Sequence, residues 1–149
     1  KLHRAFSVFA MNDKNEILLQ RRALHKYHSG GLWTNTCCSH PRDGERVEEA
    51  ARRRLMEEMG FTCAVKRVFS FIYKAELDND LTEHELDHVL IARWNDDPEV
   101  NPEEVDSFDW KSVDWVANDM KINPDRYTEW FKIIYDRFLN YWNNEDHGL

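Results

Sequence analysis

Residues 39–61 read SHPRDGERVEEAARRRLMEEMGF, and their pattern changes from a loop to a helix. Apolar side chains recur at every fourth position after the loop, at Val47, Ala51, Leu55 and Met59. This spacing predicts a helix from Arg46 to Met59 whose apolar stripe packs on a sheet. Gly60 is typical of a residue that ends a helix.

Strands are predicted on both sides of this helix. Before it, His3–Met11 and Glu16–Arg22 form a hairpin across the turn at residues 12–15, and Trp33–Cys38 forms a short strand. After it come three strand-rich segments and two helices, at 61–77, 81–94, 107–112, 115–121 and 124–143. This order predicts one α/β domain over residues 1–149, with a mixed β-sheet sandwiched between helices.

The amino-acid composition and net charge restrict the kinds of partner that this protein can bind. The chain has 149 residues, 42% of them hydrophobic, which is enough for one domain with a core. We see neither an apolar run that could cross a membrane nor a signal-peptide pattern. A net charge of −8 argues against a nucleic-acid partner. An anionic small molecule stays possible where basic residues converge, and the candidates are Arg21, Arg22, Lys26 and 52–54.

The chain has three cysteines, Cys37, Cys38 and Cys63, without the spacing of a disulfide framework. Neighbours in a strand point to opposite faces, so a bridge between Cys37 and Cys38 would be strained. We therefore expect reduced thiols and a cytoplasmic protein. Separately, we expect a monomer. Cys38 shares a strand face with His40, so we assign chemistry to Cys38 and packing to Cys37. The alternative is that Cys38 is a small buried hydrophobic residue.

Glu83 and Glu85 stand two apart on a predicted strand, so both carboxylates leave the same face and His84 points away. Like charges this close repel unless a cation or a proton relieves them. Together with His3 and His40 they form a set of ligands that suits Zn²⁺, Mn²⁺ or Fe²⁺. The alternative is a solvated strand edge.

Arg54 and Glu58 stand four apart on the predicted helix and share a face next to its apolar stripe. Taken on the helix alone, a surface ion pair is the favoured interpretation. The other possibility is that the pair borders a cleft.

Residues 39–61 resemble a Nudix box. Two positions depart from the usual pattern: Ser39 stands where the box has Gly, and Arg54 stands where it has a metal-binding Glu. A guanidinium at that position can grip a diphosphate through paired hydrogen bonds, so the box resembles one adapted to hold a diphosphate without hydrolysing it. The positions that match are Glu45, Arg53, Leu55, Glu57, Glu58 and Gly60.

Nearly the whole chain is similar to the type I isopentenyl-diphosphate isomerases. The segment LWTNTCCSHP at residues 32–41 is highly specific to that family, and the other matching segments are 21–26, 83–86 and 127–130. The resemblance implies a Nudix-like fold and the interconversion of isopentenyl and dimethylallyl diphosphates. It also implies an earlier segment, preceding Lys1, that supplies a further metal-binding histidine.

The same resemblance implies a role for each site residue. Cys38 and Glu85 would be the acid–base pair on opposite faces of the double bond, Tyr73 would support the acid near Glu85, and Trp130 would face the carbocation. One divalent ion, Zn²⁺ or Mn²⁺, would be bound by His3, His40, Glu83 and Glu85. A Mg²⁺ on the diphosphate would be bound by Glu58 and the Cys38 carbonyl. The phosphates would be contacted by Arg22, Lys26 and Arg54.

Two other functions stay open at this point. A Nudix pyrophosphohydrolase would act on a nucleotide or prenyl diphosphate, and Arg54 argues against it. A metal-binding module without activity would give Trp130 and Arg54 no role.

Overall fold

Two strands at the centre of the sheet run parallel. The computed structural model describes residues 2–144, and in it β1 (His3–Met11) pairs with β6 (Thr82–Arg93) along its whole length. The register sets His3 opposite Glu85 and Met11 opposite Arg93. β5 (Val65–Glu76) pairs antiparallel with the other edge of β6. The predicted mixed sheet is therefore confirmed, since parallel and antiparallel pairs meet at β6.

The other strands extend the sheet on the far side of β1. β4 (Cys37–Ser39) pairs antiparallel with β1, while β2 (Glu16–Arg22) pairs with β3 (Trp33–Thr34) and with β7 (Val105–Ser112). Residues 2–144 thus form a seven-stranded sheet with the main order β3-β2-β1-β6-β5.

The predicted hairpin of β1 and β2 exists only at its turn, where Met11 pairs with Ile17. Beyond it the two strands separate, and the side chain of Thr36 lies between them. Its hydroxyl accepts from the Ala10 N–H at 2.8 Å and donates to the Leu18 carbonyl at 2.7 Å. This bridge also explains why the predicted strand 33–38 is divided into β3 and β4, because residues 35–36 cross between the separated strands.

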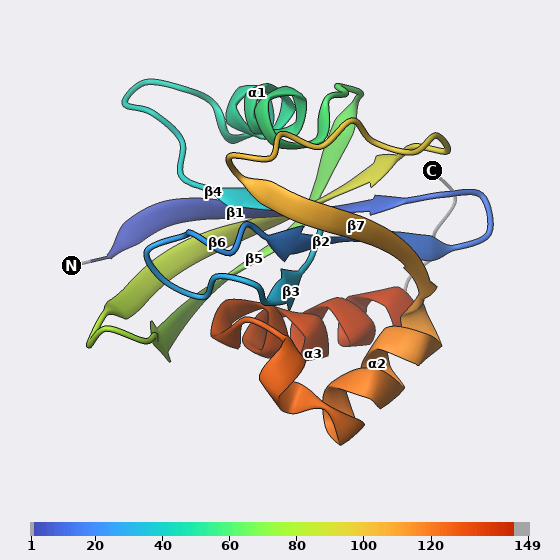
Figure 1. Cartoon of the computed structure of the whole chain (residues 1–149). Coiled ribbons are helices and arrows are strands. Elements are labelled where there is room, and N and C mark those ends of the chain that lie inside the picture. The colour runs from blue at the N-terminus through green and yellow to red at the C-terminus, as the bar shows by residue number, and fades with distance from the viewer. Residues whose placement is uncertain (1, 145–149) are drawn as a thin grey trace.

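Helices cover both faces of the sheet (Figure 1). α1 (Val47–Met59) lies on one face, and α2 (Val113–Ile122) and α3 (Glu129–Asn144) lie on the other. The predicted stripe of α1 is confirmed, because its four apolar side chains are at most 3% exposed. Gly60 ends α1 in the left-handed conformation with φ of 73°. Each face of the sheet has its own hydrophobic core.

The single helix predicted from Pro124 is interrupted. Pro124–Arg126 forms one 3₁₀ turn, Tyr127 is extended, and α3 begins at Glu129. Tyr127 forms a bridge with Trp33, and its hydroxyl donates to Asp119. These contacts hold the backbone out of the helix at this point. Among residues 2–144, no helix combines the length and apolar character that a membrane crossing requires.

Candidate active site

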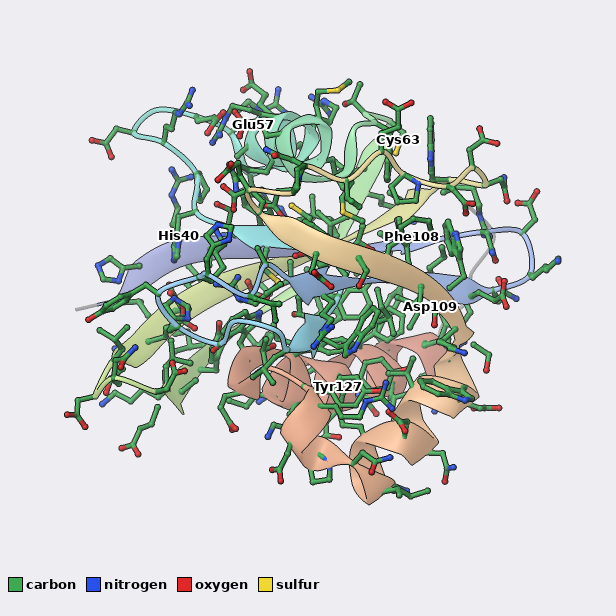
Figure 2. All side chains as sticks on the ribbon, in the orientation of Figure 1. His40, Glu57, Cys63, Phe108, Asp109 and Tyr127 are labelled. Atoms are coloured by element: carbon green, nitrogen blue, oxygen red, sulfur yellow. The ribbon has the colours of Figure 1, made fainter. Side chains whose placement is uncertain are left out.

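A cavity of about 300 Å³ opens where β1 and β2 have separated. Its wall takes residues from both strands, from α1 on one face of the sheet and from α3 on the other. Figure 2 shows Glu57 on α1 and Tyr127 among the helices of the opposite layer, with His40 beside the end of β4. Of the site residues predicted from sequence, all but His3 line this cavity: Arg22, Lys26, Cys38, His40, Arg54, Glu58, Tyr73, Glu83, Glu85 and Trp130.

The two adjacent cysteines face opposite ways, as predicted. Cys37 is fully buried in the core beneath α1, whereas Cys38 lines the cavity. The Cys38 Sγ lies 2.9 Å from Asn35 Oδ1 and 3.5 Å from Ser7 Oγ, so the thiol can donate to either oxygen. Burial, and then the neighbouring Asp87, raise the pKa of the Cys38 thiol to about 12. Cys38 therefore rests as a thiol that holds its proton.

A carboxylate and imidazole cluster occupies the end of the cavity near His40. His40 Nε2 lies 2.8 Å from Glu85 Oε1, and one ligand atom from each of His40, Glu83 and Glu85 lies within 4.8 Å of the others. The hydrogen bond to Glu85 raises the pKa of His40. His3 does not join this cluster, although its ring centroid lies 6.4 Å from that of His40.

The cluster fits a divalent metal ion. Imidazole and carboxylate are ligands that such ions prefer in proteins. Glu83 Oε1 and Glu85 Oε2 are buried without a hydrogen-bond partner, and buried polar atoms in folded proteins seldom stay unpaired. A bound cation would satisfy both atoms and relieve the repulsion of the two carboxylates.

Tyr73 lies directly across the β5–β6 ladder from Glu85. Burial raises the pKa of Tyr73 well above its ordinary value, and burial followed by the charge of Glu85 raises the pKa of Glu83. Tyr73 is therefore a neutral phenol at the edge of the carboxylate and imidazole cluster.

The Arg54–Glu58 pair forms, but at the cavity wall rather than on the open surface. Arg54 Nη2 lies 2.7 Å from Glu58 Oε2, and the two side chains are 20% and 7% exposed. Gln20 Nε2 donates to the other Glu58 oxygen at 2.9 Å. Burial raises the pKa of the Glu58 carboxyl, although Arg54 and Gln20 both stabilise the carboxylate.

The two other basic side chains of the cavity, Lys26 and Arg22, have different interaction partners. Lys26 forms an ion pair with Glu104, which also lies 3.6 Å from Arg54. Within residues 2–144, Arg22 has no carboxylate partner within 4.0 Å, and burial lowers the pKa of its guanidinium. Arg22 instead lies over the Trp130 ring, with its Cζ 5.1 Å from the ring centroid.

Orphaned polar atoms concentrate at this cavity. Among the described residues, buried side-chain nitrogens and oxygens without a partner belong to its wall in every case except Trp94. They include Nε of Arg22 and Nε1 of Trp130. Such atoms cost free energy unless a ligand, an ion or water meets them, so their grouping marks the cavity as a binding site.

Sequence reasoning missed several residues of this site. Asp87 continues the alternation of Glu83 and Glu85, and it receives a hydrogen bond of 3.1 Å from Ser7. The spacing of two could have identified Asp87, because every second strand residue faces the same way. Ser7 and Asn35 lie in strand-like segments without any local signal of a site.

Comparison of this chain with known proteins identifies its family. The model of the NUDIX domain matches residues 1–131. An isopentenyl-diphosphate Delta-isomerase of Pectobacterium atrosepticum is 48% identical over 142 residues, covering 95% of this chain and 79% of the relative. A second such enzyme, of Photorhabdus laumondii, is 53% identical over 133 residues, or 89% of this chain and 75% of the relative.

The chain belongs to the isopentenyl-diphosphate isomerases of the Nudix family. Solved Nudix structures share its fold at low identity. A MutT protein from Methanosarcina mazei superposes with a TM-score of 0.75 at 17% identity, covering 97% of this chain and 96% of that one. The predicted Nudix-like fold is thus confirmed, and the isomerase family is distinguished by sequence rather than by fold.

Proposed function

We propose that this chain interconverts isopentenyl and dimethylallyl diphosphate by moving one proton onto the carbon chain and another off it. Protonation of the terminal methylene uses the electron pair of the double bond and leaves a tertiary carbocation. A proton is then lost from the methylene on the other side of the cationic carbon, and the electron pair of that broken C–H bond forms the shifted double bond. The observation that supports this most is that Cys38 and Glu85 line one cavity from β4 and β6, the strands paired to opposite edges of β1.

Cys38 and Glu85 form the proposed acid–base pair. Cys38 holds its proton at neutral pH because burial raises its pKa to about 12. Glu85 Oε2 is buried without a partner, so it can exchange a proton with a substrate in the cavity. Tyr73 lies directly across the β5–β6 ladder from Glu85, and we assign it a supporting role for the acid at this position.

The carbocation needs stabilisation without a nucleophile. Trp130 is 5% exposed and presents an indole to the cavity, and a cation over such a face gains about 2 kcal/mol when water is excluded. The Cζ of Arg22 lies 5.1 Å from the centroid of this ring, and this arrangement supports a role for the ring beside a positive charge.

The diphosphate supplies binding energy at the other end of the substrate. Arg22, Lys26 and Arg54 are the proposed contacts, and Arg22 is the one without a competing carboxylate among residues 2–144. Lys26 and Arg54 are partly neutralised by Glu104 and Glu58, so the anion requires further positive charge. Mg²⁺ bound by Glu58 and the Cys38 carbonyl would supply it.

We assign a second divalent ion, Zn²⁺ or Mn²⁺, to His40, Glu83 and Glu85, with His3 as a ligand only after its side chain moves. Such an ion changes the acidity of the groups beside it. His40 orients Glu85 through their 2.8 Å contact. In this proposal the catalytic domain spans residues 1–149 and is a monomer, and its free thiols support a cytoplasmic location.

Deuterium exchange tests the reaction directly. Incubated with the protein in D₂O, isopentenyl diphosphate should convert to dimethylallyl diphosphate that carries deuterium on the former terminal methylene, and a chelator should abolish both the conversion and the deuterium uptake. Release of inorganic phosphate or pyrophosphate without isomerisation would instead support the alternative pyrophosphohydrolase. Metal uptake without either product would indicate a binding module.

A further inference from the structure

A continuous series of hydrogen bonds leads from the Cys38 thiol through three buried residues that do not line the cavity. The thiol donates to Asn35 Oδ1 at 2.9 Å, and the Thr34 hydroxyl donates to the same oxygen at 3.0 Å. The Thr128 hydroxyl lies 3.3 Å from the Thr34 hydroxyl. Thr34, Asn35 and Thr128 are at most 2% exposed, so water does not compete for these bonds.

The Asn35 amide is fixed in one orientation. Its Nδ2 donates to the Val8 carbonyl at 2.9 Å and to the Cys37 carbonyl at 3.2 Å. With both N–H groups committed to the backbone, Oδ1 is the atom presented to the Cys38 thiol. The thiol's other acceptor, Ser7 Oγ, lies farther away at 3.5 Å and donates its own proton to Asp87.

The opposite end of the series holds the start of α3. Thr128 Oγ1 accepts from the Phe131 N–H at 3.2 Å and so caps this helix, while the Thr128 N–H donates to the Trp33 carbonyl at 3.0 Å. Trp130 stands two residues after the cap. One buried series therefore connects Cys38, which faces the cavity from β4, with the helical turn that carries Trp130.

From this arrangement we infer that Asn35, Thr34 and Thr128 are positioning residues, which orient the Cys38 thiol and keep it at a fixed distance from the Trp130 indole. The inference rests on the proposed function for its role in catalysis. The physical reason is that the thiol must exchange a proton with a carbon atom while the ring faces the resulting cation. The distance and orientation between thiol and ring must therefore be fixed. A displacement of about 1 Å in such a pair can cost on the order of a hundredfold in rate.

The series can be cut at its centre without loss of the helix cap. Thr34→Val keeps the shape of the side chain and removes the hydroxyl, whereas Thr34→Ser keeps the hydroxyl. We expect Thr34→Val to lower kcat for isopentenyl diphosphate roughly 10- to 100-fold with KM changed by no more than about twofold. Thr34→Ser should restore most of the rate. Wild-type kcat in Thr34→Val, or equal losses in both variants, would overturn the inference.

A second cut and a matched control separate positioning from stability. Thr128→Val removes the hydroxyl that links the series to α3 and caps this helix, while the Thr128 N–H bond to Trp33 remains. Ser112→Ala removes the corresponding cap of α2, where Ser112 accepts from the Trp115 N–H at 3.1 Å. Both should lower Tm, but only Thr128→Val should lower kcat, and Thr128→Ser should recover it. Equal kcat in Thr128→Val and Ser112→Ala would reject the connection to Trp130. If Thr34→Val does not fold, this pair gives the deciding comparison.

One measurement needs neither a variant nor turnover. In the wild-type protein, NMR should detect the hydroxyl protons of Thr34 and Thr128 in slow exchange with water, because both donate to buried oxygens. Fast exchange at both hydroxyls would refute the series itself. Slow exchange in a protein that does not isomerise would instead refute the proposed function and leave the series intact.

Discussion

Arg54 Nη2 and Glu58 Oε2 are separated by 2.7 Å at the wall of the cavity. The pair lies on α1 at positions where a Nudix hydrolase gathers carboxylates for metal ions. Arg54 places a guanidinium where such a helix has a carboxylate, and it pairs with the side chains of both Glu57 and Glu58. This relationship favours a helix that binds a diphosphate over one that activates water to cleave it.

Charge reversal at Arg54 should weaken substrate binding more than turnover. We expect Arg54→Glu to raise KM for isopentenyl diphosphate roughly 10- to 100-fold, since hydrogen bonds to charged groups contribute about 1.5–3 kcal/mol. Arg52→Glu is the matched control, because it makes the same charge change on the same helix at a residue outside the cavity. Steady-state kinetics would measure both variants. An unchanged KM in Arg54→Glu would refute a phosphate contact.

The two adjacent cysteines should differ sharply in their effect on catalysis. Cys38→Ala should lower isomerisation by about a hundredfold to ten-thousandfold, the range typical of a lost general acid or base. Cys37→Ala should keep most of the activity and lose thermal stability, because Cys37 is fully buried in the core beneath α1. Deuterium exchange and Tm report the two effects. The reverse pattern would show that the assignment of their facing is wrong.

Metal affinity should depend on His40 and not on His84. His40 contributes a ligand atom to the cluster, whereas the neighbouring strand residue His84 does not. Loss of an outer-shell partner typically costs 10- to 100-fold in affinity, so His40→Ala should cost at least roughly this much in Zn²⁺ or Mn²⁺ affinity. Titration calorimetry of metal-free protein would measure it. Equal affinity in His40→Ala and His84→Ala would exclude the cluster as the ion site.

Asp87 should make the metal-free protein less stable as the pH rises. Burial raises its pKa to about 7 in the folded state, against about 3.9 in an unfolded chain. Between these values the folded state binds more protons than the unfolded one, so this contribution to stability falls as pH rises and the cost is complete above the folded pKa. Asp87→Asn should therefore raise Tm at pH 8 and have little effect near pH 4.

Asp43→Asn is the control for this pH effect, since Asp43 is exposed and lies in a loop. Thermal unfolding should be followed in the presence of a chelator, because a bound cation would also relieve the charge of Asp87. A lower Tm for Asp87→Asn at pH 8 would show that the buried carboxylate stabilises the fold instead.

Local patterns were sufficient for the parts of the fold that depend on periodicity. The helix ending at Gly60 follows from an apolar repeat and a left-handed terminator, and the opposite facing of Cys37 and Cys38 follows from the alternation of a strand. The prediction of a single helix from Pro124 was wrong, because the backbone of Trp33, which pairs with Tyr127 and accepts from the Thr128 N–H, lies far away in the sequence.

The sequence by itself determined the Nudix-type α/β fold, the isomerase family and the residue types of the site, because repeats, turns and motifs are written within a few consecutive positions. Tertiary structure alone decided how His40 meets Glu85, how Arg22 comes to lie over Trp130, and how Asn35 holds the Cys38 thiol. His40 follows β4 and Glu85 lies on β6, and these two strands pair with β1, whereas Arg22 and Trp130 come from a strand and a helix far apart in the sequence. A gap between β1 and β2, spanned by one threonine hydroxyl, makes the cavity possible, and no local pattern predicts that two neighbouring strands will part.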